Sequence, residues 1–142
     1  MDICQDIIQA RGAGDLIVRI EPVAVECPMQ AARLFGLFDA PDIYVEVSKD
    51  EARAVLVAML VKDMAYGCPL VAPAEASRLA DAFLGAIGSG TRRYFTNGDY
   101  GRPRVHPDIG PSGTPATAHT FDSGVLVLAA AQVGCAWFMD ED

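Results

Sequence analysis

The sequence has 142 residues, of which 51% are hydrophobic and 21% charged, so it has enough apolar side chains for a folded core and too many for a disordered chain. Its net charge of −8, from 19 acidic and 11 basic residues, argues against nucleic-acid binding, because the phosphate backbone would be repelled. No apolar run approaches the roughly 20 residues that cross a bilayer. We therefore expect one domain over residues 1–142, without contact to a membrane.

The first third of the chain predicts alternating helices and strands. Isoleucines at helical spacing predict a helix over residues 2–11. Extended segments are expected at 16–20 and 23–25, where β-branched residues predominate. A second helix is predicted to begin at Pro28 and end near residues 39–41, followed by a half-exposed strand over 43–47.

Two helices are predicted in the middle of the chain. Ser48 and Glu51 have the spacing of a capping box, in which each side chain bonds the other residue's backbone amide. The helix that they begin is expected over 49–66, and a second is expected from Pro73 to Ile87. The residues expected on the buried face of the first helix are Val55, Leu56, Met59 and Leu60.

The last third predicts strands around a long loop. A strand is expected over 92–96, and residues 98–118, with four prolines and four glycines, form a long irregular loop. Residues 125–128 and 133–139 predict a C-terminal β-hairpin whose first strand is covered on both faces. The predicted fold class is α+β, a mixed or antiparallel sheet packed by about three to four helices.

The sequence contains no catalytic, nucleotide-binding or zinc motif, so we expect no cofactor and no bound metal. The four cysteines stand singly, without a paired Cys or an interleaved histidine. One alternative is a small enzyme or ligand-binding domain that uses the 98–122 region, with His106, His119 and Asp122 as its polar groups. Another is a subunit or scaffold that self-associates, for example as a homodimer.

The chain ends in Trp-Phe-Met-Asp-Glu-Asp, residues 137–142, which joins the only tryptophan to three acids. With its size, acidic balance, lack of a catalytic motif and final strand pair, this ending resembles the bacterial immunity proteins of polymorphic or contact-dependent toxin systems. The resemblance is one of overall organisation. It implies a non-enzymatic protein that binds a toxin domain and occludes its active site. The N-terminus has no signal-peptide pattern, so we expect a cytoplasmic location.

Under this resemblance, carboxylates meet a basic surface of the toxin or of another protein, and an aromatic ring anchors the contact. Trp137 is expected in the core, because it lies within the strand pattern. The predicted partner-binding residues are Asp99, Tyr100, Asp108, Asp122, Asp140, Glu141 and Asp142.

Overall fold

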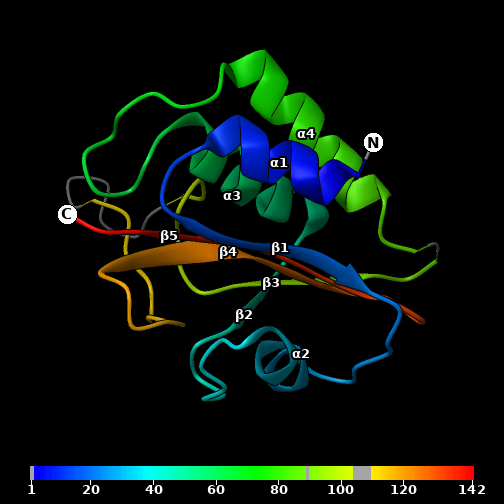
Figure 1. Cartoon of the computed structure of the whole chain (residues 1–142). Coiled ribbons are helices and arrows are strands. Elements are labelled where there is room, and N and C mark those ends of the chain that lie inside the picture. The colour runs from blue at the N-terminus through cyan, green and yellow to red at the C-terminus, as the bar shows by residue number, and fades with distance from the viewer. Residues whose placement is uncertain (1, 89, 104–109) are drawn as a thin grey trace.

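Five strands of the computed structural model form one antiparallel sheet in the order β1-β5-β4-β3-β2 (Figure 1), and residues 2–88, 90–103 and 110–142 are described. The strands are β1 (Asp15–Glu21), β2 (Val45–Val47), β3 (Arg93–Thr96), β4 (Phe121–Leu128) and β5 (Val133–Asp140). The helices are α1 (Ile3–Arg11), α2 (Pro28–Phe35), α3 (Lys49–Val61) and α4 (Pro73–Gly85). The predicted α+β class and C-terminal hairpin are confirmed.

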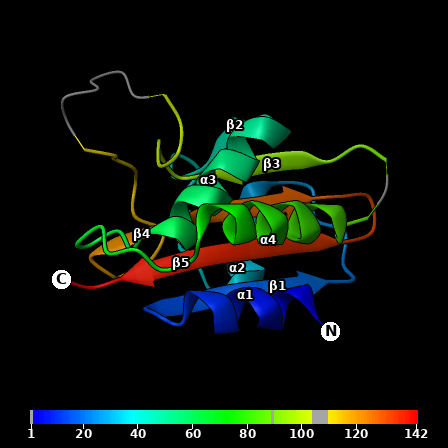
Figure 2. The same ribbon diagram turned by 90° about the horizontal axis from the view of Figure 1, so that it is seen from above.

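Helices cover both faces of this sheet. Helices α1, α3 and α4 lie together on one face, and α2 lies on the other (Figures 1 and 2). Two buried clusters follow from this arrangement, one between the sheet and the three helices and one between the sheet and α2. None of the described helices is long and apolar enough to cross a membrane.

The hairpin of β4 and β5 occupies the middle of the sheet. Its register runs from Phe121 opposite Asp140 to Leu128 opposite Val133. Every residue of β5 is buried, and so is every residue of β4 after Phe121, which explains why these segments lack hydrophobic alternation. Trp137 is fully buried on the α2 side, edge-on to Tyr44 at a ring separation of 6.0 Å, so its predicted core placement is confirmed.

The capping box at the start of α3 is present as predicted. The Glu51 amide donates to the Ser48 hydroxyl at 3.1 Å, and the Ser48 amide donates to the Glu51 carboxylate at 3.1 Å. The four residues predicted on the buried face of α3 are all buried. The helix ends at Val61, five residues before its predicted end, and the chain then turns around the Asp63 side chain.

Three other predictions of element positions are wrong. Helix α2 ends at Phe35 instead of near residue 39, because Gly36 takes a left-handed conformation with φ 80° and its amide caps the helix. Residues 23–25 belong to no strand, and β2 begins at Val45 instead of residue 43. These errors arose where apolar residues continue beyond the end of an element.

Candidate functional site

The first part of the predicted irregular loop is packed against α3. Gly101 has φ 70°, and a Cβ added there would lie 2.4 Å from the Ala54 carbonyl oxygen, so only glycine fits this close approach. Next to it, Arg102 donates from Nε to the Glu51 carboxylate at 3.0 Å and from Nη1 to the Gly98 carbonyl at 2.8 Å. The chain just after β3 is therefore fixed to the helix.

The two described ends of the loop also bond to each other. The Asp99 amide donates to the Ser112 carbonyl at 2.9 Å, and the Ser112 amide donates back to the Asp99 carboxylate at 2.6 Å. An isolated bridge between Gly98 and Gly113 continues this pairing. Residues 98–103 and 110–114 therefore form a folded wall beside the start of β4.

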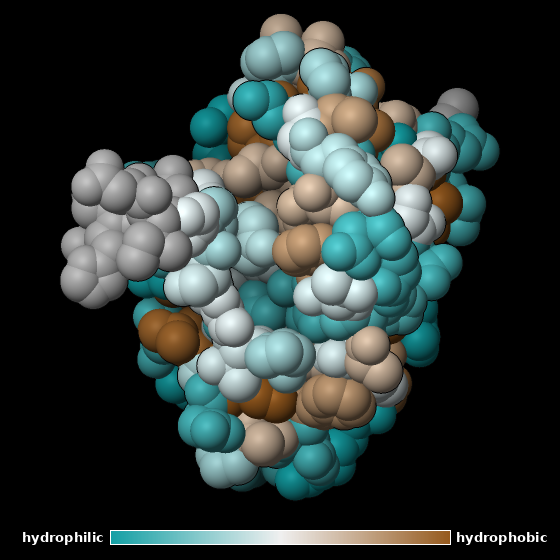
Figure 3. All heavy atoms as spheres, turned by 90° about the vertical axis from the view of Figure 1, so that its left-hand side faces the viewer, coloured by the Kyte–Doolittle hydropathy of each residue, from teal (hydrophilic) through white to brown (hydrophobic). Residues whose placement is uncertain are grey.

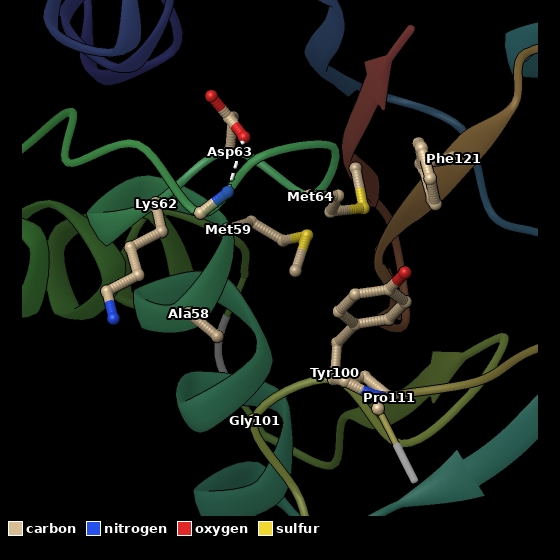
Figure 4. A pocket seen from close by; sticks show the side chains of 11 residues that line it. Ala58, Met59, Lys62, Asp63, Met64, Tyr100, Gly101, Pro111 and Phe121 are labelled. Carbon is tan, nitrogen blue, oxygen red and sulfur yellow. Dashed lines mark hydrogen bonds between the residues drawn. The ribbon is translucent and has the colours of Figure 1, made fainter. Parts of the chain in front are cut away.

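This wall encloses a pocket of about 450 Å³ together with the end of α3 and the start of β4. Four side chains converge on it, Met59 from the left, Met64 from above, Tyr100 from below and Phe121 from the right, whereas Lys62 points away (Figure 4). A smaller hollow of about 210 Å³ shares Tyr100, Pro111 and Phe121 with the pocket. Tyr100 thus stands between two connected depressions.

The turn that carries Met64 is held by two carboxylates. Asp63 accepts hydrogen bonds from the amides of Tyr66 at 2.7 Å and Gly67 at 2.9 Å, which hold the pKa of the Asp63 carboxyl below its usual range. The Met64 amide donates to the Asp140 carboxylate at 2.9 Å. The upper rim of the pocket is therefore set by backbone hydrogen bonds.

Asp140, one of the residues predicted to contact a partner, is buried. Its carboxylate receives two hydrogen bonds from the Arg11 guanidinium, of 3.0 and 2.7 Å, and both side chains are almost inaccessible. Arg11 also donates to the carbonyls of Met59 at 2.8 Å and Ala13 at 2.7 Å. Asp140 therefore joins α1, α3 and β5 inside the protein and has no free oxygen for a partner.

Asp122, also predicted to contact a partner, is buried as well. Its carboxylate accepts hydrogen bonds from the side chains of Asn97, Thr117 and Trp137, each at 3.0 Å. The amides of Ala116 and Thr117 donate to it at 3.0 and 3.1 Å. Because amide and indole nitrogens can only donate here, Asp122 is the acceptor that fixes the end of the loop against β4.

Other carboxylates gather at the same end of the sheet, the left-hand side of Figure 1. Glu141 is exposed and accepts from the Thr120 hydroxyl and amide, which lower the pKa of the Glu141 carboxyl. It shares a hollow with Asp63 and lies close enough to Asp15 for their charges to interact. We call Asp15, Asp63, Asp99, Glu141 and Asp142 the acidic end.

The acidic end retains part of the predicted partner-binding set. Glu141 and Asp142 are exposed, Asp99 and Tyr100 are partly buried, and Asp108 lies outside the described residues. Figure 3 shows this side of the molecule, where hydrophilic surface lies next to apolar patches. Aromatic and acidic groups are thus adjacent here, as the partner-binding hypothesis requires.

The groups proposed for an enzyme are not brought together in the described part of the chain. The His119 ring meets Asp15 at 2.9 Å, at the start of the edge strand β1, and His106 lies outside the described residues. Burial raises the pKa of the Cys4 thiol to about 11 and that of Cys135 further still, so neither is a ready nucleophile. Among the described residues, no three His, Cys, Asp or Glu side chains cluster as metal ligands.

Sequence reasoning missed the pocket itself. The helical spacing predicts Met59 and Met64 on the face of a helix that packs on the sheet, and it assigns no role to Phe121. No local pattern links Met64 with Phe121, because the two residues are 57 positions apart. The alternation of β4 offered one signal, because Phe121 and Asp122 must point to opposite faces of the sheet. With Asp122 turned towards Trp137, Phe121 is left on the side of α3.

Comparison with known proteins found no matching family model, no similar curated protein and no similar solved structure.

Proposed function

We propose that the protein is a non-enzymatic protein-binding module that binds a basic protein through its acidic end. The observation that supports this is the apolar pocket of about 450 Å³ beside exposed carboxylates. Interfaces combine a buried aromatic or apolar centre with a polar rim, and opposite charges on the partner accelerate association. The finer proposal, based on the resemblance described above, is an immunity protein that occludes the active site of a cognate bacterial toxin.

The test uses the tagged protein as bait in a lysate of its natural host. A second bait carries Glu141→Gln and Asp142→Asn, and a matched control carries Glu26→Gln and Asp42→Asn, which neutralise two exposed carboxylates elsewhere. We expect the unmodified bait to capture a basic partner in stoichiometric amount. At low salt, this partner should associate at least about 3-fold more slowly with the bait that carries Glu141→Gln and Asp142→Asn, and at an unchanged rate with the control bait. Absence of such a partner, or equal rates for all three baits, would contradict the proposal.

The immunity function has its own experiment. The captured partner is expressed alone and together with the protein in a bacterial host, and growth is recorded. A toxin partner should stop growth alone and allow it when co-expressed. A harmless partner would contradict the immunity function but leave protein binding intact.

A ligand-binding domain is a second candidate, favoured by the size of the pocket. Its volume falls within the roughly 300–1,000 Å³ of small-molecule sites. The pocket uses Tyr100 and Phe121 from the proposed 98–122 region, but its lining does not include His119. Purification from the natural host followed by native mass spectrometry would show a bound small molecule as added mass.

A further inference from the structure

The pocket is lined by aromatic and methionine side chains, although exposed carboxylates lie near it. Two aromatic rings, Tyr100 and Phe121, and two thioethers, Met59 and Met64, face the same space (Figure 4). Asp99 lies beside Tyr100. Asp63 and Lys62 also belong to the lining, but the charged ends of both side chains turn away from the cavity (Figure 4). We propose that this pocket holds the side chain of an arginine from the basic partner, an inference that rests on the proposed function.

An arginine fits both parts of this lining. A guanidinium stacks on aromatic faces, is more weakly hydrated than an ammonium, and is attracted by the negative face of the ring. Its alkyl chain needs apolar contact, which the flexible methionine side chains supply. Arginine is also among the residues that contribute most to protein interfaces.

The electrostatic field in the pocket favours a cation. Asp122 accepts hydrogen bonds from neutral donors, and within residues 2–88, 90–103 and 110–142 no Lys, Arg or His side chain forms an ion pair with it. Its charge is screened weakly because it is buried, and it lines the hollow next to the pocket. Asp140 contributes less, since Arg11 offsets its charge.

The carboxylates that produce this field also act on the Tyr100 hydroxyl. Burial, followed by the charges of Asp122, Asp99 and Asp140, raises the pKa of the Tyr100 hydroxyl. The carboxylates' share of this effect stabilises a positive charge at the same place, whereas burial disfavours a charge of either sign. The ring therefore offers a neutral aromatic face inside a negative field, the environment that cation–π contacts require.

The experiment uses the whole chain with ¹³C-labelled methionine methyl groups, assigned by Met59→Leu and Met64→Leu. The probe is acetyl-arginine amide, and its control is acetyl-citrulline amide, which has nearly the same shape without the charge. We expect saturable shifts of the Met59 and Met64 methyl signals with a Kd on the order of 1–10 mM, a range suited to a single side chain. Met29 and Met139, which do not line the pocket, should not respond.

Two variants test the aromatic contribution. Tyr100→Phe keeps the ring and should bind the probe within about 2-fold of the unmodified protein, whereas Tyr100→Leu should weaken binding at least about 5-fold. Both variants should keep the remaining methionine spectrum, which shows that they fold. No saturable shift, equal binding of citrulline, or unchanged binding by Tyr100→Leu would overturn the proposal.

The result is separable from that of the proposed function. A basic partner that binds the protein, with no response of the pocket to the arginine probe, would overturn this inference alone. Binding of the probe without any protein partner would overturn the partner as the source of the cation. If both hold, the probe should compete with the captured partner, and failure to compete would place the arginine elsewhere.

Discussion

Arg11 at the end of α1 and Asp140 at the end of β5 are 129 positions apart and form two parallel hydrogen bonds in the interior. The guanidinium also lies over the Phe138 ring, with its carbon 5.2 Å from the ring centroid. A buried charge is tolerated only when it is paired and fully hydrogen-bonded, and each partner here fulfils that condition for the other.

Removing one member of this pair should be strongly destabilising. We expect Arg11→Met to lower the free energy of unfolding by about 3–5 kcal/mol, because Asp140 is left buried without its cation. The double variant Arg11→Met with Asp140→Leu should recover much of that loss. Urea denaturation of both variants measures the difference, and a single-variant loss under about 1 kcal/mol, typical of exposed pairs, would contradict the buried geometry.

Asp122→Asn tests the other buried carboxylate. One oxygen becomes an NH₂ group facing backbone or side-chain donors, so at least one hydrogen bond becomes a donor–donor contact. We expect a loss of about 1–3 kcal/mol in unfolding free energy. The same change at exposed Asp142 should stay within about 0.5 kcal/mol, and equal effects at the two sites would refute the interior role of Asp122.

Gly101→Ala should detach the pocket wall from α3. The new methyl would overlap the Ala54 carbonyl and require a left-handed conformation for alanine. Gly36→Ala is a matched control, since Gly36 has φ 80° but nothing within 4 Å of an added Cβ. We expect Gly101→Ala to lower the thermal midpoint more than Gly36→Ala and to shift the Met59 and Met64 methyl signals, which the control should leave in place.

Ser48→Ala should remove the N-terminal cap of α3 and cost about 0.5–2 kcal/mol. Ser77→Ala, within α4, replaces the same side chain where alanine is the better helix former, so it should be neutral or slightly stabilising. Circular dichroism of both variants gives their unfolding midpoints, and the difference between them measures the contribution of the cap. Equal midpoints would show that the cap contributes nothing measurable.

Much of the fold could be predicted because its signals are local. The capping box, the proline at the start of α4 and the apolar run of β4 each specify their own element within a few residues. The wrong boundaries lie where local signals conflict, as at Gly36, where apolar Leu37 and Phe38 continue past the helix.

The site was less predictable, because its chemistry depends on distant partners. An acid near the end of a chain is usually solvated, and nothing within a few residues of Asp140 shows that Arg11 will meet it. Alternation within β5 does contain a hint, since Asp140 shares a face with the buried Phe138. To predict the pocket, the positions of α3, the 98–118 loop and β4 relative to one another would also have to be known.

The pairing of β1 with β5 has a consequence for how the chain reaches this structure. Asp15 lies opposite Met139, so the first strand acquires its neighbour only after β5, which is distant in the sequence, has been synthesised. Before β5 is available, β1 has no strand with which to pair. A nascent chain that lacks β5 should therefore remain loosely ordered. Closing so long a loop is slow, and we expect folding in the millisecond-to-second range typical of sheets with distant pairings.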